Sequence, residues 1–313
     1  MHVVLTHPIH EDGLNALTSS GLRITISPSP DRNTILSLIH DADGLLVRTA
    51  GVFDGELMDH APNLKVIGRH GVGVDHIDLD AARERGIVVV NTPEANSQAV
   101  AEYASGLMVS LFRFMQEADT APRVGDWNAR DRLVGTELIG RTLGIIGLGR
   151  VGSRIARICS LGFQMKVIYY DIVRKPEFER DLGVEFASFD EVVTQSDILT
   201  LHTPLTPLTR SMINEKTLAS MKEGSCLLNA SRGPVVDLDA LVGSLQSGHL
   251  AGAGLDVFPD EPLDPSHPIM SLPNVRLSPH MASRSHESMI RMALVAEDVA
   301  RVLNGEEPRF PVT

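Results

Sequence analysis

The chain has 313 residues, which is long enough for two domains of ordinary size, each with its own core. Hydrophobic residues make up 43% of it and charged residues 22%, as in proteins that fold in water. The net charge of −12 would repel nucleic acid and anionic membranes. The first residues lack a basic segment followed by an apolar one, and no apolar run is long enough to cross a bilayer, so we expect a cytoplasmic protein with neither kind of partner.

The first third of the chain alternates short apolar runs with helical patterns, which favours a small α/β domain with a parallel sheet. Strands are expected at 3–5, 45–47, 65–67 and 87–90, and helices at 11–20, 32–40 and 78–85. A long, mostly apolar helix over 97–116 would then link this domain to the next.

The most informative stretch follows, at 141–171. Its order is an apolar strand, a glycine turn, a helix, a second apolar strand and an acid, which is the dinucleotide-binding fingerprint. Gly147 allows the tight turn, Gly149 lets the backbone approach the diphosphate, and Gly152 lets the helix pack closely on the strand. The helix N-terminus favours phosphate, and Asp171, 19 residues after Gly152, is placed to bind a ribose diol.

The acid also bears on the choice of coenzyme. A carboxylate beside the adenosine ribose would repel a 2′-phosphate, so the sequence favours NAD. Arg174 and Lys175 follow closely, and they leave some use of NADP open.

Further strands are expected at 197–201, 225–229, 253–257 and 274–277, and together they complete a second sheet. Polar segments follow three of them and contain Arg232, Glu261 and His280. Ligands gather beyond the carboxyl ends of parallel strands, so these side chains are expected beside a bound nicotinamide. Taken singly, each is also compatible with an ordinary surface or loop residue.

The three side chains suit hydride transfer to a 2-oxo acid. Arginine offers a planar fork of donors to a carboxylate and to a carbonyl oxygen that gains charge. Histidine can give or take the alcohol proton near neutral pH, and a neighbouring glutamate fixes its ring. Cys159 and Cys226 have no disulfide or metal-ligand spacing and are expected to be buried apolar side chains, so no metal is predicted.

A last helix over 285–304 is expected to return to the first domain. The predicted fold class is therefore α/β, with a Rossmann-type doubly wound parallel sheet inserted in a smaller, flavodoxin-like α/β domain. The substrate domain would comprise residues 1–97 and 286–313, and the NAD-binding domain residues 98–285.

Several motifs together resemble the D-isomer-specific 2-hydroxyacid dehydrogenases, and the similarity extends over nearly the whole chain. They are GLGRVG (147–152), HTPLTPLTR (202–210), NASRGPVVD (229–237), GLDVFPDEP (254–262), SPH (278–280), GRHGVGVDHIDL (68–79) and NTPEANSQAVAEYA (91–104). Phosphoglycerate dehydrogenases and glyoxylate/hydroxypyruvate reductases are the most similar members.

The resemblance implies an NAD-dependent oxidoreductase that acts on a CH–OH group and forms a homodimer through its cofactor domain. Its catalytic set would be Arg232, Glu261 and His280. Further residues would contact NAD: Arg150 and Val151 beside the glycines, Asp171 and Thr203 near the adenosine, and Ala230, Ser231 and Asp256 near the nicotinamide.

On the substrate side, the resemblance implies that a loop of the small domain, His70, Gly71, Val72 and Gly73, binds the carboxylate through backbone N–H groups. His70 stands where the family usually has a small residue, and Arg284 lies in a run that is usually uncharged. Arg48, Arg69, His70 and Arg284 either bind a second anionic group, such as phosphate, sulfonate or carboxylate, or form surface ion pairs.

The substrate is thus a small anionic 2-hydroxy or 2-oxo acid, with 3-phosphoglycerate as the first candidate. Glyoxylate, hydroxypyruvate and sulfolactate-type substrates are alternatives. Two functions of other classes also stay open: an NAD-sensing protein that recruits partners, like the C-terminal binding corepressors, and a hydrolase that oxidises its substrate transiently with bound NAD.

Overall fold

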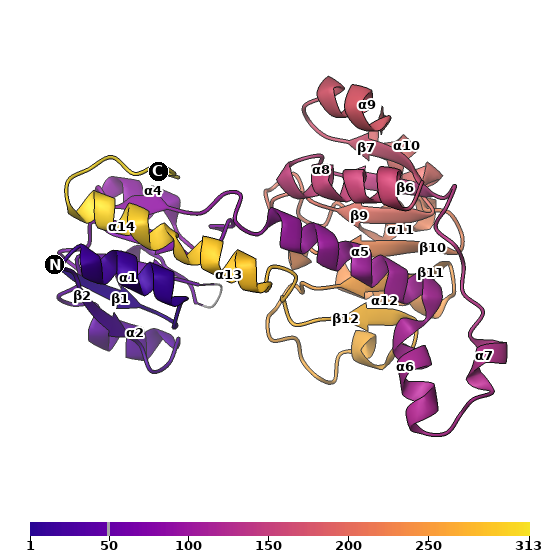
Figure 1. Ribbon diagram of the computed structural model, residues 1–313, viewed down its shortest axis with the longest axis horizontal. Helices are drawn as coiled ribbons and strands as arrows, with labels where there is room; N and C mark the ends of the chain where they lie inside the picture. The colour runs from indigo at the N-terminus through magenta and orange to yellow at the C-terminus, as the bar shows by residue number, and fades with distance from the viewer. Residues whose placement is uncertain (49–50) are drawn as a thin grey trace. The chain divides into compact units, whose positions relative to one another are not determined.

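The computed structural model describes residues 1–48 and 51–313, and the chain divides into two compact units (Figure 1). Unit 1 contains residues 1–96 and 284–313, and unit 2 contains residues 97–283. Unit 2 is therefore inserted in the sequence of unit 1. None of the helices in the described ranges is long and apolar enough to cross a bilayer.

Unit 1 is built on a five-stranded parallel sheet with the order β2-β1-β3-β4-β5, the flavodoxin-like order. The central strands are apolar runs buried on both faces, as parallel sheets require. The strands are β1 (His2–Leu5), β2 (Arg23–Ile26), β3 (Gly44–Val47), β4 (Val66–Arg69) and β5 (Val88–Val90). The edge strand β2 was not expected, because its residues RITI alternate in polarity and remain partly exposed.

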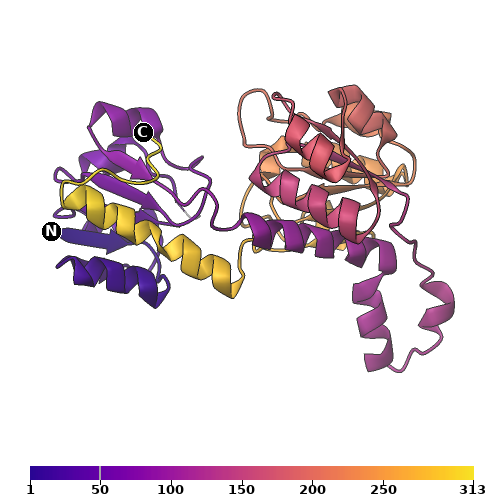
Figure 2. The same ribbon diagram turned by 45° about the horizontal axis from the view of Figure 1, so that its top comes forward.

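Helices cover both faces of this sheet (Figure 2). One face packs against α1 (Glu11–Ser19) and α14 (Val295–Leu303), through side chains such as Leu17 and Val299. The other face packs against α2 (Arg32–Leu38), α3 (Gly55–Asp59) and α4 (Leu79–Glu84). The prediction of a single C-terminal helix over 285–304 is wrong, because α13 (His286–Ala293) ends before α14 begins.

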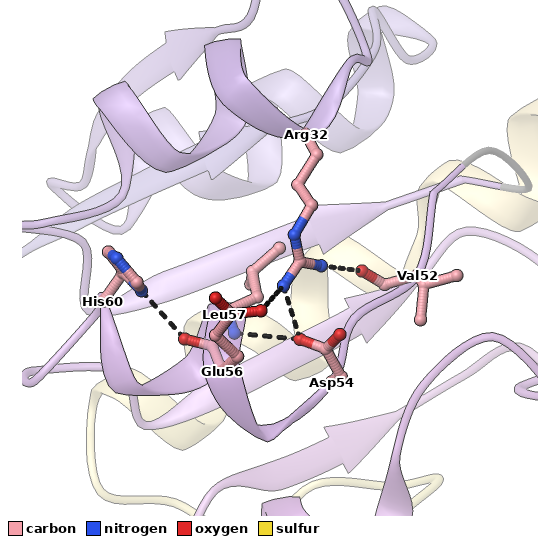
Figure 3. Close-up of polar contacts among 6 residues, drawn as sticks. All are labelled: Arg32, Val52, Asp54, Glu56, Leu57 and His60. Carbon is pink, nitrogen blue, oxygen red and sulfur yellow. Dashed lines mark hydrogen bonds and ion pairs between the residues drawn. The ribbon is translucent and has the colours of Figure 1, made fainter.

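Arg32 fastens α2 to the start of α3 (Figure 3). Its guanidinium donates to the Val52 carbonyl oxygen at 3.1 Å and pairs with the carboxylates of Asp54 at 2.8 Å and Glu56 at 2.9 Å. Asp54 also caps α3 by accepting the Leu57 N–H. This cluster is a structural anchor on the unit 1 surface.

Unit 2 has a seven-stranded parallel sheet with the order β12-β11-β10-β9-β6-β7-β8. The direction of winding reverses between the neighbours β6 and β9, as in doubly wound nucleotide-binding folds, whose ligands bind at the carboxyl end of this point. The expected fold class is confirmed. The strands are β6 (Thr142–Ile146), β7 (Lys166–Tyr170), β8 (Glu185–Phe186), β9 (Ile198–Leu201), β10 (Ser225–Asn229), β11 (Leu250–Leu255) and β12 (Val275–Leu277).

Two apolar clusters sandwich this sheet. One face packs against α5 (Ser97–Arg113), α8 (Arg150–Arg157) and α9 (Pro176–Leu182), and Cys159 is buried among them as expected. The other face packs against α10 (Phe189–Gln195), α11 (Glu215–Ser220) and α12 (Leu238–Gln246). Cys226, in β10, is buried as well.

The helix expected over 97–116 does not run unbroken. Phe114 adopts a left-handed conformation with φ of 51°, which ends α5, and the chain continues as α6 (Met115–Arg123) and α7 (Ala129–Arg132). The segment that contains α6 and α7 exposes large apolar side chains, among them Val124, Trp127 and Val134. Such a run of exposed apolar groups is typical of an interaction surface.

Candidate active site

The glycine turn of unit 2 leaves room for a ligand at the start of α8. Gly147 has φ of 95°, and a Cβ there would lie 2.7 Å from the His202 carbonyl oxygen. A Cβ on Gly152 would overlap the Gly147 carbonyl. A Cβ on Gly149, by contrast, would meet nothing within 4 Å, so the protein's own packing does not require glycine at this position. Open space at a helix N-terminus without a side-chain cap suits a phosphate group.

Asp171 lies at the tip of β7 beside this turn. Its Oδ2 accepts the Leu148 N–H at 2.8 Å, and its Oδ1 accepts the Val173 N–H at 3.1 Å. These bonds fix the carboxylate next to the glycines, and each oxygen still has a lone pair for a ribose hydroxyl. Thr203, after β9, has a buried hydroxyl that finds no partner among the described residues. A buried polar atom without a partner is a site where a ligand can supply one. The turn therefore fits a dinucleotide.

The segment after β10 is locked by Asn229. The Asn229 side chain accepts hydrogen bonds from the N–H of Ser231 at 3.0 Å and from its hydroxyl at 2.8 Å. It also donates to the Arg232 carbonyl oxygen at 2.9 Å, while the Arg232 guanidinium donates to the Ser231 carbonyl at 2.7 Å. Gly233 follows, and a Cβ there would overlap the Phe258 backbone. Sequence reasoning did not assign Asn229 this positioning role.

Asp256, at the end of β11, holds the loop that carries His280. It is 1% exposed, and its carboxylate accepts the Ser278 hydroxyl at 2.5 Å and the N–H groups of Met281 at 2.9 Å and Ala282 at 2.8 Å. The loop needs this support because His280 has a left-handed backbone with φ of 50°. The structure thus shows Asp256 as a loop-positioning residue. A direct contact with NAD was the expectation for it.

Glu261 and His280 form a pair. The distance from His280 Nδ1 to Glu261 Oε2 is 2.7 Å, and Glu261 Oε1 accepts the Phe258 N–H at 3.0 Å. Burial by itself would raise the pKa of Glu261. The hydrogen bond and charge of His280, the Phe258 N–H and the charge of Arg232 outweigh that effect and lower the pKa below its usual value. The carboxylate is therefore ionised at neutral pH.

Both members of this pair are reachable from solvent, since the side chains of His280 and Glu261 are 30% and 32% exposed. They face a cavity of about 460 Å³ with mostly apolar walls. It is lined by Phe258, Glu261, Pro262, Leu263, Met270, Leu277, Ser278, Pro279 and His280. A reachable imidazole held by a charged carboxylate is suited to proton transfer.

In unit 1, the loop after β4 is held by its carbonyl groups. Arg69 donates to the carbonyl oxygens of His70 and of Gly73, the latter at 2.7 Å. Asn91 donates to the Val72 carbonyl at 2.7 Å, and Thr92 donates to that of Gly71.

The N–H groups of Gly71, Val72 and Gly73 donate to no atom in the described part of the chain. A row of such donors is suited to a carboxylate. Arg69, for which an anion contact and a surface ion pair were both left open by the sequence, thus helps to organise this loop.

Positive charge gathers at the same edge of the unit 1 sheet. Arg48 directly follows β3, and His70 directly follows the adjacent strand β4. Burial lowers the pKa of Arg48, and the charge of the nearby Arg284 lowers it further. His70 is 3% exposed, and its Nε2 has no partner among the described residues. Burial and then the nearby Arg48 and Arg69 lower the pKa of His70 to about 3, so its ring is neutral. A neutral ring has a single N–H, and it can donate to an anion in the tautomer that has this proton on Nε2.

A nucleotide-binding sheet, a glycine turn with room for phosphate and a His–Glu pair at the same strand ends define an NAD-dependent oxidoreductase. Comparison with known proteins agrees. Residues 105–282 match the family model of the D-isomer specific 2-hydroxyacid dehydrogenase, NAD binding domain. The chain belongs to the D-isomer specific 2-hydroxyacid dehydrogenase family, and the expected family, enzyme class and cofactor are confirmed.

Relatives in this family carry several activities. A glyoxylate reductase of Thermofilum pendens is 43% identical over 315 residues, which cover 98% of this chain and 92% of the relative. A D-3-phosphoglycerate dehydrogenase of Archaeoglobus fulgidus is 37% identical over 97% of this chain, but the match spans only 58% of that relative. The solved D-lactate dehydrogenase of Aquifex aeolicus, in complex with NAD and lactic acid, superimposes with a TM-score of 0.87 at 31% identity and covers 97% of this chain and 95% of its own.

Proposed function

We propose that the enzyme interconverts a small 2-hydroxy acid and its 2-oxo acid, with Arg232, Glu261 and His280 as its catalytic residues. The observation that carries this proposal is the 2.7 Å pair of His280 and Glu261, set at the strand ends of an NAD-binding sheet. Its partial exposure makes it accessible to a substrate, while the Asp256 bonds keep its loop in one conformation.

Each catalytic side chain has a separate task. The nicotinamide coenzyme, when bound, would supply or accept the hydride at C2 of the substrate. His280 gives a proton to the C2 oxygen, or takes it back in the reverse reaction, at Nε2, because Nδ1 is engaged by Glu261. Glu261 stabilises the charged ring, and the Arg232 fork binds the substrate carboxylate and the C2 oxygen as it gains negative charge.

The coenzyme is assigned to the glycine turn and to the neighbouring strand ends. Gly147, Gly149 and Gly152, with Arg150 and Val151, would surround the diphosphate. Asp171 and Thr203 would contact the adenosine side, and Ala230, Ser231 and Asp256 would border the nicotinamide. The open space at Gly149 and the unpartnered Thr203 hydroxyl support this placement.

The substrate is assigned to the donors of unit 1. The N–H groups of Gly71, Val72 and Gly73 would bind the carboxylate. Arg48, His70 and Arg284 would bind a second anionic group, because their donors gather at one sheet edge and the His70 Nε2 is unused. A phosphate-bearing substrate such as 3-phosphoglycerate suits this set. Glyoxylate, hydroxypyruvate and sulfolactate-type acids are the alternatives to test beside it.

The assembly is proposed to be a homodimer formed through unit 2, in the cytoplasm. The exposed apolar side chains between Phe114 and Ile139 support such a contact, since a monomer gains nothing by leaving Trp127 74% exposed. Sedimentation of the purified protein would test the dimer.

A substrate panel tests the reaction. The purified enzyme is mixed with NADH and with glyoxylate, hydroxypyruvate, 3-phosphohydroxypyruvate, sulfopyruvate or oxaloacetate, and the NADH absorbance is followed. We expect oxidation of NADH with at least one of these acids, and the highest kcat/KM with one that has a second anionic group. Absence of turnover with every 2-oxo acid, despite tight NADH binding, would contradict the proposal and favour an NAD-sensing interaction protein.

A further inference from the structure

The loop after β7 is tied down by a buried tyrosine. The Tyr169 hydroxyl donates to Glu179 Oε1 at 2.8 Å and accepts the Lys175 N–H at 2.8 Å. Tyr169 belongs to β7 and Glu179 to the first turn of α9, so this one hydroxyl joins the strand, residues 171–175 and the helix. The loop that contains Asp171 therefore has a defined conformation.

Arg174 is held in the same network. Its Nε donates to Glu179 Oε1 at 2.8 Å, and its Nη2 donates to Oε2 at 2.7 Å, which is a two-point contact. Its guanidinium carbon also lies 5.6 Å from the centroid of the Phe186 ring. The Glu179 side chain is only 19% exposed, although Arg174 is 62% exposed, so the carboxylate is well shielded and the arginine is held against it.

The ion pair of Arg174 and Glu179 persists at neutral pH. The pKa of Glu179 is lowered to about 2. The hydrogen bond from Arg174 is the main cause. Burial opposes it, and the hydrogen bond from Tyr169 adds to it. Both partners are therefore charged at neutral pH.

The position of Arg174 bears on the coenzyme. In dinucleotide-binding folds an acid at the end of the second strand binds the ribose 2′-hydroxyl of NAD, whereas a nearby arginine accommodates the 2′-phosphate of NADP. This chain has both residues on one loop: Asp171, bonded to the glycine turn, and Arg174 three residues later. The arginine that would serve NADP is present, but its fork is already bound to Glu179.

We infer that Glu179 is a coenzyme-selectivity residue: it keeps Arg174 against Phe186 and away from a 2′-phosphate, so the repulsion from Asp171 is not offset. This inference rests on the proposed placement of the adenosine ribose at Asp171. Glu179 acts here through Arg174 and is a positioning residue.

The test is Glu179→Gln, which keeps the side-chain size and an acceptor for Tyr169 but removes the charge that binds Arg174. We expect kcat/KM with NADPH to rise roughly tenfold, since a released arginine can bond to phosphate, while kcat/KM with NADH stays within about twofold. Binding of 2′,5′-ADP, measured by calorimetry against ADP, should tighten in parallel without any turnover.

Two further variants make the test specific. Glu177→Gln changes the same amount of charge in the same helical turn and should leave the coenzyme preference unaltered. Arg174→Gln should abolish the NADPH gain when it is combined with Glu179→Gln. In the wild-type background Arg174→Gln should have little effect on kcat/KM with NADPH. This comparison remains valid even if Glu179→Gln folds poorly.

The possible outcomes distinguish an error in the role of Glu179 from an error in the proposed coenzyme site. An equal NADPH gain in both glutamate variants, or a gain that survives Arg174→Gln, would overturn the selectivity inference with NADH-dependent activity intact. If the wild type binds neither NADH nor ADP, and Asp171→Ala leaves kcat/KM with both coenzymes unaltered, the proposed coenzyme site itself is contradicted.

Discussion

Glu261 reaches His280 at 2.7 Å across a gap of 19 residues in sequence, with its second oxygen bonded to the Phe258 N–H. One carboxylate therefore fixes the imidazole ring and is itself fixed by the backbone. This arrangement leaves Nε2 as the nitrogen available for proton transfer.

His280→Gln should lose most of kcat, because glutamine can form hydrogen bonds but cannot exchange a proton. The loss expected for a general acid–base residue is about 10²- to 10⁴-fold. NADH affinity, measured by fluorescence titration, should remain within about threefold, since the glycine turn is untouched. Turnover near the wild-type rate would remove His280 from the mechanism.

Gly149→Val should separate coenzyme binding from folding. A Cβ at Gly149 meets nothing within 4 Å, and the residue has an extended backbone that other residues adopt readily. The variant should therefore melt within a few degrees of the wild type but bind NADH at least about tenfold more weakly, because its side chain fills the phosphate space.

Gly152→Ala is the matched control, since a Cβ there overlaps the Gly147 carbonyl and should lower the melting temperature directly. If NADH affinity is unchanged in a folded Gly149→Val protein, the diphosphate does not bind at this turn.

The glycine turn and the buried strands could be predicted because their signals are local: apolar runs, glycine spacing and a terminal acid. The edge strands β2 and β8 could not, because they are partly or fully exposed and lack a continuous apolar run. The break at Phe114 was missed for a similar reason, since no glycine or proline marks it.

In the site, the roles missed in the sequence depend on bonds between distant segments. Asp256 supports a loop 22 to 26 residues away, and Asn91 and Thr92 hold carbonyls of the 70–73 loop. No periodicity or short motif encodes such contacts. The sequence indicated candidate catalytic side chains, but it did not indicate which residues keep them in place.

His70 should make unit 1 sensitive to acid. Its pKa is about 3 in the folded protein, whereas the unfolded value is near 6.5, so the unfolded chain binds an extra proton between these limits. The contribution of the neutral His70 to the free energy of unfolding is therefore complete above about pH 6.5. It decreases as the pH falls through this window, by about 2 kcal/mol at pH 5.

Melting temperatures at pH 7 and pH 5 check this, with His70→Asn as the comparison. The variant should lose less stability than the wild type over the same interval. Equal losses in both proteins would mean that His70 does not contribute to the acid sensitivity.

Arg232→Lys should weaken substrate binding and slow the reaction, because lysine keeps the charge but loses the planar two-point fork. The expected cost is about 2 kcal/mol in kcat/KM, or about thirtyfold, divided between a higher KM for the 2-oxo acid and a lower kcat. NADH binding should change little, since the Asn229 bonds that shape this segment involve the backbone of Arg232, and its guanidinium adds only one bond, to the Ser231 carbonyl. A KM equal to that of the wild type would show that the carboxylate is bound elsewhere, and the N–H groups of Gly71, Val72 and Gly73 would then be its main ligands.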